Sequence, residues 1–338
     1  MQNKPKIKRI LVATGIYPPD IGGPAQYAYE LEKIWKTEGY DVTVKYFLFE
    51  RKLPTGIRHI WFLIKSLPSI FRADFILVLD TWSVALPVAI GSMLCGKKFI
   101  VRTGGDFLWE AYTERTNQKI LLRNFYRESV GNFSIKEKLI FRVTKWILKE
   151  AKKIVFSTDW QREIWTLPYG IKKEKTTIIE NYYGEHFENK IAEPKTFVGT
   201  TRKLTYKNLD SLEEIFRDQK IKDLGINLDM RICPRNDFEK KIQNSFAVIL
   251  ISLGDISPNM ILDAIRYNKP FIVTHEVGIK ERIKDISIFV DPLNPEDVKK
   301  KIIWLCNESN YITQKKKVES FTFRHSWQEI SGEFFSLQ

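Results

Sequence analysis

Four charged side chains in the second half of the sequence are spaced for binding a diphosphate. Arg202 and Lys207 lie five residues apart in one loop, and Asp255 and Asp263 lie eight residues apart around Ser257-Pro258-Asn259. Arginine and lysine neutralise phosphate, whereas carboxylates accept hydrogen bonds from sugar hydroxyls. Ser257-Pro258-Asn259 is expected to begin a helix, whose free N–H groups can bind an anion. This combination predicts a site for a sugar attached to a diphosphate.

Each of these residues also has a simpler interpretation. Asp255 and Asp263 could be acids at a helix start and on a solvated surface. Arg202 and Lys207 lie in a lysine-rich loop, where surface charges need no special explanation. Only their occurrence together favours the binding site.

A second anion-binding feature lies near the N-terminus, in the segment 10–44. A short apolar run at 10–13 predicts a buried parallel strand, and Gly22-Gly23 followed by Pro24 predicts a turn into a helix. A glycine-rich turn between a strand's carboxyl end and a helix's amino end is a typical place for an anionic ligand. The alternative is that these glycines only turn the chain.

Strand-like apolar runs alternate with helical patterns along nearly the whole sequence. This order predicts βαβ units, parallel sheets and an α/β fold. The expected strands are 8–13, 41–47, 75–79, 98–102, 153–156, 177–179, 196–199, 228–232, 246–252, 270–274 and 288–290. The loop-rich stretch 182–194 predicts a linker, little chain remains between 232 and 246 for a further βα unit, and the tail from 311 is expected to be helical.

Composition limits the class of protein without naming its function. A chain of 338 residues with 43% hydrophobic content is long enough for two globular domains. Its 54 Lys and Arg against 41 Asp and Glu favour nucleic acid, anionic lipid or phosphorylated substrates as partners. Three scattered cysteines and a polar, basic start indicate a reducing compartment, no zinc site and no signal peptide, so a cytoplasmic location is expected.

Three segments leave alternatives open. The apolar stretch 75–94 is either a membrane span or, as favoured by the break at Asp80-Thr81, a strand followed by a helix. The segment 56–72 is a helix packed on a sheet or a helix lying on a membrane surface. The basic region 115–153 is a solvated helical face or a surface for nucleic acid or anionic headgroups.

Four motifs in order resemble the family 4 glycosyltransferases of GT-B architecture over nearly the full chain. They are the opening YPPDIGGPAQYAYEL, the segment FVGTTRKLTYKNLD, the acidic motif DISPNMILDAIRYNKPFIVT and the closing HSWQEI. The resemblance implies two Rossmann-like domains facing across a cleft. The first domain, 1–190, would hold the acceptor. The second domain, 191–310, would bind the nucleotide-sugar and would be a shortened version of the family's second domain. The C-terminal segment 311–338 would be a helix returning to the first domain.

The resemblance also implies roles for individual residues. Arg202 and Lys207 would hold the donor diphosphate and stabilise charge on the leaving group, and Asp255 would contact the donor sugar. Asp263 would bind the nucleotide ribose, while Ser257, Pro258 and Asn259 belong to the same donor motif. Gly22 and Gly23 would approach the donor phosphates or the acceptor.

The sequence departs from the family in several places. Aspartate replaces the usual glutamate at both acidic positions, and Arg202 lies two residues later than expected after Gly199. Gly104, in the stretch RTGGDF, stands where the family often has a histidine. Asp106 is then the nearest candidate for contact with the acceptor.

The leading hypothesis is transfer of a sugar from a nucleotide-sugar to a glycan or lipid-linked acceptor, with retention by family analogy. No Asp-x-Asp motif occurs, and the four histidines have no metal-ligand spacing, so metal-independent transfer without a cofactor is expected. The second hypothesis is an inactive GT-B-like binding protein, motivated by the aspartates and the shortened second domain. A nucleic-acid-binding protein is a remote third, because no such motif is recognised. Peripheral contact with an anionic membrane, on its cytoplasmic face, is a separate expectation.

Overall fold

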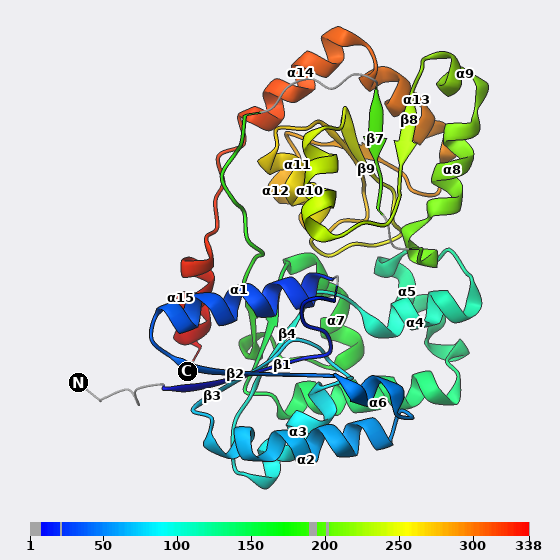
Figure 1. Ribbon diagram of the computed structural model, residues 1–338. Coiled ribbons are helices and arrows are strands. Elements are labelled where there is room, and N and C mark those ends of the chain that lie inside the picture. Colours follow the sequence, from blue (N-terminus) through cyan, green and yellow to red (C-terminus); the bar gives the residue numbers. More distant parts are fainter. Residues whose placement is uncertain (1–7, 21, 189–194, 201–202, 338) are drawn as a thin grey trace. The chain divides into compact units, whose positions relative to one another are not determined.

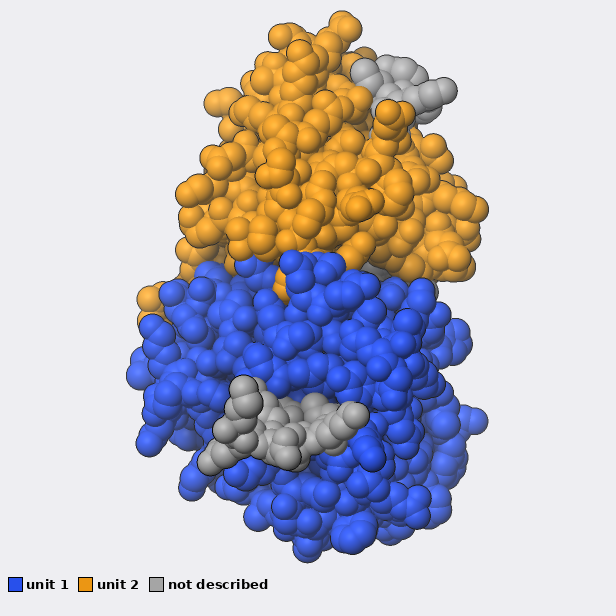
Figure 2. Space-filling model, turned by 90° about the vertical axis from the view of Figure 1, so that its left-hand side faces the viewer, with its two compact units in different colours: residues 1–108, 132–181, 326–338 blue, residues 109–131, 182–325 orange. Residues whose placement is uncertain are grey.

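The protein consists of two compact α/β units (Figures 1 and 2). The computed structural model describes residues 8–20, 22–188, 195–200 and 203–337. Unit 1 comprises residues 1–108, 132–181 and 326–338, and unit 2 comprises residues 109–131 and 182–325. Each unit contains one parallel sheet, which confirms the predicted fold class.

Unit 1 is built on a six-stranded sheet with the order β2-β1-β3-β4-β5-β6. Its strands are β1 (Arg9–Thr14), β2 (Asp41–Tyr46), β3 (Phe75–Val78), β4 (Ile100–Thr103), β5 (Lys153–Phe156) and β6 (Thr176–Ile178). Its main helices are α1 (Gly23–Thr37), α2 (Ile57–Arg72), α3 (Ala85–Leu94), α6 (Ile135–Glu150), α7 (Asp159–Tyr169) and α15 (Trp327–Ser336), and short 3-10 turns are η1 (Phe49–Lys52) and η3 (Lys173–Lys175). Helices α2, α3 and α6 cover one face of the sheet, and α1 and α15 cover the other (Figure 1).

Unit 2 is built on a five-stranded sheet with the order β11-β10-β9-β7-β8. Its strands are β7 (Thr196–Val198), β8 (Asn227–Asp229), β9 (Ala247–Leu250), β10 (Phe271–Thr274) and β11 (Ile288–Val290). Its helices are α5 (Leu122–Ser129), α8 (Leu209–Arg217), α9 (Gln219–Asp223), α10 (Arg235–Gln243), α11 (Asn259–Arg266), α12 (Lys280–Ile283), α13 (Pro295–Leu305) and α14 (Glu308–Glu319), with η4 (Thr205–Lys207). Helix α4 (Phe107–Thr116) and η2 (Val130–Asn132) lie where the chain passes between the units.

Both sheets are buried on two faces, as expected for parallel strands that read as continuous apolar runs. Every residue of β3, β9 and β10 is buried. In unit 2 two apolar clusters lie against the sheet, one including Val248 and Leu250 of β9 and the other including Ala247 and Ile249. These alternate residues of one strand therefore contribute to different clusters.

The segment 75–94 forms β3 and α3, as the favoured interpretation predicts. The predicted helix at 56–72 is α2, with Pro68 inside it. Among the described residues, no helix is both long and apolar enough to cross a membrane.

The units differ from the expected ranges 1–190, 191–310 and 311–338. Residues 109–131 and 182–190 group with unit 2, and the expected C-terminal helix is two helices. Helix α14 belongs to unit 2, whereas α15 returns to unit 1. In unit 1 the Trp35 indole donates a hydrogen bond of 2.9 Å to Ser331 of α15, and Phe334 lies edge-on to the same indole.

Candidate active site

Lys207, one of the two predicted cations, and Asp255, the first predicted acid, lie together at the carboxyl ends of two neighbouring strands. Strand β7 leads through η4 to Lys207, and β9 leads into the loop that carries Asp255. Because β7 and β9 pair in parallel, their following loops lie at one edge of the sheet. The Lys207 Nζ lies 2.5 Å from Asp255 Oδ2, and both side chains are largely buried. Arg202 lies outside the described residues.

Backbone hydrogen bonds hold this pair in place. The N–H of Leu253 donates to the carbonyl of Tyr206 at 2.8 Å, which joins the two loops. The N–H of Asp255 donates to the carbonyl of Glu276 at 2.9 Å, and Gly278 donates back to Asp255 at 2.9 Å. These two hydrogen bonds join the loop after β10 to the loop after β9, which is itself bonded to the loop after β7.

The remainder of the predicted donor motif leads directly into a helix. Asn259 is the first residue of α11, Pro258 precedes it, and Ser257 lies in the bend between Asp255 and the helix. A helix of eight residues begins where the sequence predicts one. Its amino end therefore follows the Lys207–Asp255 pair in the same loop.

Asp263, the second predicted acid, points into a buried network. Its side chain is only 4% exposed, and both carboxylate oxygens lie 2.7 Å from the guanidinium of Arg235 on α10. Arg266 lies one turn later on α11, and its Nη1 is 3.6 Å from Asp263 Oδ1. Burial raises the pKa of the Asp263 carboxyl above its usual value, and the charge of Arg235 opposes that rise. The structure thus separates this carboxylate from Asp255 and pairs it with arginine.

A buried ion pair that the sequence analysis did not single out lies next to Asp255. Glu276 is 4% exposed and follows β10. The Arg123 guanidinium of α5 contacts it through Nε and Nη2, each 2.6 Å from a carboxylate oxygen. Burial raises the pKa of the Glu276 carboxyl, and Arg123 opposes the rise. The basic region 115–153 thus contributes one of its arginines to a structural pair inside unit 2.

Replacing Arg123 by glutamine is expected to give a stability loss that depends on pH. At pH 7 the variant should lose about 2 kcal/mol, because Glu276 is left buried without its cation. Without Arg123 the pKa of Glu276 rises further. Below about pH 4 the carboxyl is protonated in the folded and unfolded states alike, so the loss should shrink there and grow as the pH rises. Urea unfolding at several pH values measures this.

Arg127→Gln is the matched control, because Arg127 lies one turn later on α5 and its side chain is 76% exposed. The control should unfold like the wild type at every pH. A deficit for Arg123→Gln that does not change between pH 4 and 7 would contradict the assignment to Glu276.

The segment 109–131 packs directly on the loop that carries Asp255. A Cβ added at Gly254 would lie 2.5 Å from the Cβ of Leu122 and 3.0 Å from the Trp109 ring. The N–H of Leu122 donates to the carbonyl of Leu253 at 3.1 Å, and the Trp109 and Tyr206 rings lie 4.9 Å apart. These contacts explain why this segment groups with unit 2.

In unit 1 the predicted glycine turn precedes α1. Gly22 occupies the position before the helix, and Gly23 and Pro24 are its first residues. A Cβ at Gly22 would lie 2.6 Å from Cδ1 of Ile16, so a larger residue here would force the Ile16 side chain to move. The sequence expectation of a strand–glycine–helix turn is confirmed.

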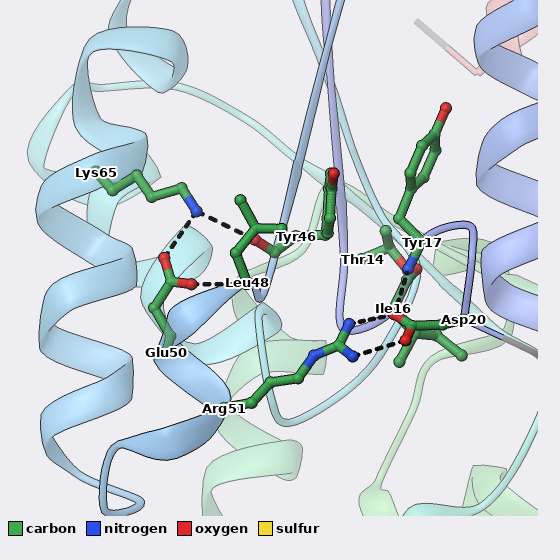
Figure 3. A network of polar contacts seen from close by, with 9 residues as sticks. All are labelled: Thr14, Ile16, Tyr17, Asp20, Tyr46, Leu48, Glu50, Arg51 and Lys65. Atoms are coloured by element: carbon green, nitrogen blue, oxygen red, sulfur yellow. Dashed lines mark hydrogen bonds and ion pairs between the residues drawn. The ribbon is translucent and has the colours of Figure 1, made fainter.

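Polar contacts fix the residues before that turn (Figure 3). Asp20 accepts a hydrogen bond from Arg51 Nη1 at 2.7 Å, and this arginine holds the pKa of the Asp20 carboxyl below its usual range. The Tyr17 ring stacks on Tyr46 with 4.9 Å between centroids. Tyr17 also donates a hydrogen bond to Glu32, and burial together with that contact raises its pKa. The loop after β1 is thus fastened to η1, β2 and α1.

Asp106, the predicted acceptor contact, is buried against α7. It is 2% exposed and accepts a hydrogen bond of 2.8 Å from the Trp165 indole. This gives Asp106 a packing role, and its role toward an acceptor stays a prediction. Arg102, four residues earlier in β4, is 6% exposed and lies 3.6 Å over the Tyr27 ring. The sequence analysis had not selected this buried cation.

The described residues contain no group of three or more His, Cys, Asp or Glu placed to hold a metal ion. Transfer without a metal remains a prediction. A donor diphosphate would in that case be neutralised by arginine, lysine and backbone N–H groups.

Solved structures show which known fold this chain shares. No protein-family model matches the sequence, and no curated protein matches it. The HepE protein of Anabaena, solved with UDP-glucose, is similar with a TM-score of 0.67 and 13% identity over 97% of this chain and 98% of that one. Sucrose-phosphate synthase of Thermosynechococcus elongatus is similar with a TM-score of 0.67 and 11% identity over 98% of each chain. The lipopolysaccharide outer core galactosyltransferase WaaB is similar with a TM-score of 0.60 and 12% identity over 98% of this chain and 99% of that one.

The chain has the GT-B fold of these glycosyltransferases. At this level of identity the comparison establishes the fold alone.

Proposed function

We propose that the protein is a glycosyltransferase that moves a sugar from a nucleoside-diphosphate sugar to an acceptor hydroxyl. The observation that carries this proposal is the pair of Lys207 and Asp255, 2.5 Å apart at the carboxyl ends of β7 and β9. A cation and an acid side by side, followed by the start of α11, provide one group for each half of a nucleotide-sugar. The shared fold supports the same function, since HepE was solved with UDP-glucose.

The Lys207–Asp255 pair suggests how donor binding prepares the site. In the protein without ligand the ammonium neutralises the carboxylate. An incoming diphosphate carries more negative charge than Asp255 and draws the Lys207 ammonium toward itself. The carboxylate of Asp255 is then released to accept hydrogen bonds from sugar hydroxyls. Arg202, five residues before Lys207, would add a second cation to the diphosphate.

In the proposed reaction the bond between the anomeric carbon and the diphosphate oxygen breaks, and a bond from the acceptor oxygen to that carbon forms on the same face. The proton of the acceptor hydroxyl passes to the departing phosphate. The protein positions the two substrates and stabilises the charge that develops on the diphosphate, with no metal ion. A glycan or a lipid-linked sugar is the proposed acceptor.

A panel of nucleotides tests the proposal. UDP, GDP and ADP are added separately, and the unfolding temperature of the protein is recorded. One of them should raise it by several degrees at millimolar concentration, because a ligand that binds only the folded state stabilises it. The corresponding nucleotide-sugar should be hydrolysed slowly without acceptor, and Asp255→Asn should reduce that hydrolysis. Failure of every nucleotide to stabilise the wild type would overturn the proposal.

A second candidate is an inactive nucleotide-sugar-binding protein. The burial of Asp263 against Arg235 favours it, because a carboxylate paired in this way is less available to a ribose. The same panel separates the two: stabilisation by a nucleotide without any hydrolysis or transfer of its sugar supports the inactive protein.

A further inference from the structure

Helix α2 of unit 1 exposes a row of apolar side chains along its whole length. One side of the helix faces the interior through Phe62, Ser66 and Ile70. The other side carries five large apolar side chains that are between 48% and 67% exposed, namely Ile57, Ile60, Trp61, Ile64 and Phe71. Pro68 is exposed on the same side. Their spacing of three, four and seven residues places them on one helical face. We call this row the α2 stripe.

The turn before α2 extends the stripe. Leu48 and Phe49 of the η1 region are 59% and 55% exposed. The Phe49 ring lies edge-on to the Trp61 ring with 6.4 Å between centroids. Large exposed apolar side chains that contact one another form a patch, and such patches on a folded protein mark interaction surfaces.

The charges beside the stripe are all positive. The segment 56–72 contains no Asp or Glu, and its cations Arg58, Lys65 and Arg72 recur every seven residues, which places them on one line along the helix. Lys65 is neutralised by Glu50 at 2.7 Å (Figure 3). Arg72 at the end of the helix is exposed.

Further lysines lie near the two ends of α2. Lys52 precedes the helix by five residues and is exposed. At the other end, Lys97 Nζ donates to the carbonyl of Ala73 at 2.9 Å, which places this lysine at the end of α2, and the exposed Lys98 is the next residue in the chain. The acids near these positions are already paired: Glu50 with Lys65, and Asp74 with Arg9. Within the described part of the chain, the exposed Lys52 and Arg72 form no ion pair, so uncompensated positive charge remains near both ends of the stripe.

We propose that the α2 stripe lies on an anionic lipid membrane. A helix with a long apolar face that includes Trp and Phe, bordered by cations, matches the boundary between acyl chains and anionic headgroups. The helix would lie flat, with the stripe among the acyl chains and the cations among the headgroups. A second copy of this chain fits less well, because a two-fold contact that pairs the stripes of antiparallel helices would bring the same rows of cations together. This inference does not depend on the proposed donor site.

Vesicle co-sedimentation of the full chain tests the inference. Vesicles of equal parts phosphatidylglycerol and phosphatidylcholine should sediment the wild type at low salt, whereas vesicles of phosphatidylcholine alone should leave most of it in solution. The double variant Ile60→Ser with Ile64→Ser should partition about tenfold more weakly, since it removes apolar area from the stripe. Arg72→Gln with Lys98→Gln should weaken binding at low salt and reduce its dependence on salt.

Leu167→Ser is the matched control. Leu167 is 89% exposed on α7, so the substitution removes an exposed apolar side chain outside the stripe, and binding should stay at the wild-type level. Because all the substituted side chains are exposed or partly exposed, unfolding temperatures should not change. No binding to anionic vesicles at low salt, or undiminished binding of the Ile60/Ile64 variant, would overturn the inference. So would a wild-type dimer that this variant converts to a monomer.

Discussion

Replacing Lys207 by alanine is expected to reduce donor hydrolysis or transfer by about 10²- to 10³-fold. The reason is that Lys207 supplies positive charge to the departing diphosphate, where negative charge increases in the transition state. The loss should be mainly in kcat, and the nucleotide should also stabilise the variant less than the wild type. Steady-state kinetics with the donor found in the nucleotide panel, and thermal shift with its nucleotide, measure the two effects.

The contact between Lys207 and Asp255 allows a sharper test. If Lys207→Ala acted only by leaving Asp255 without its partner, removing that acid as well would restore stabilisation by the nucleoside diphosphate, which lacks the sugar that Asp255 would contact. We expect no such rescue in the double variant Lys207→Ala with Asp255→Ala, because Lys207 acts on the donor rather than on the acid. Lys220→Ala, at an exposed lysine of α9, should keep full activity. Full activity of Lys207→Ala itself would exclude Lys207 from the reaction.

Replacing Asp263 by alanine is expected to destabilise unit 2 by about 3 kcal/mol, because Arg235 loses its buried partner. In a domain of this size such a loss lowers the unfolding temperature by about 6–12 °C. Urea unfolding and calorimetry would measure it. The double variant Asp263→Ala with Arg235→Met should recover part of the loss, since it also removes the arginine whose buried partner is gone and which then keeps only Glu239 at 2.8 Å.

Asp285→Ala serves as the control for Asp263, because Asp285 is an exposed acid in the same unit and should change stability by less than about 0.5 kcal/mol. The stability measurement also separates two roles of Asp263. A variant that keeps wild-type stability but no longer responds to the nucleotide would indicate a carboxylate that contacts ligand. A variant with lowered stability would indicate one that holds α10 to α11.

The strands were predictable because parallel strands buried on both faces are continuous apolar runs. The runs at 153–156 and 288–290 match β5 and β11 in full. The run 228–232 was placed too late, since β8 is Asn227–Asp229 and Ile232 is exposed. Ends are harder to place than strands themselves, because a few apolar residues often continue beyond the last paired one.

The Lys207–Asp255 contact was also accessible from sequence. Both residues follow strands that a parallel sheet brings together, so the topology alone places their loops at one edge. The partners of Glu276 and Asp263, by contrast, could not be predicted from the sequence. Arg123 is 153 residues from Glu276, and the membership of 109–131 in unit 2 depends on packing of Leu122 and Trp109, which no periodicity encodes. The break of the C-terminal tail had a local signal that was overlooked, the Ser326–Glu329 capping box at the start of α15.

The return of α15 to unit 1 has a consequence for biosynthesis. Trp35 Nε1 bonds to Ser331, a residue that the ribosome adds 296 positions later. Until the last helix emerges, the apolar surface of α1 that includes Trp35 and Tyr27 has no cover from α15, although the chain of unit 2 is already complete. The order of synthesis therefore favours completion of unit 2 before unit 1, the reverse of the usual N-terminal-first order. A chain shortened by its last dozen residues should expose the α1 surface and depend on chaperones to stay in solution.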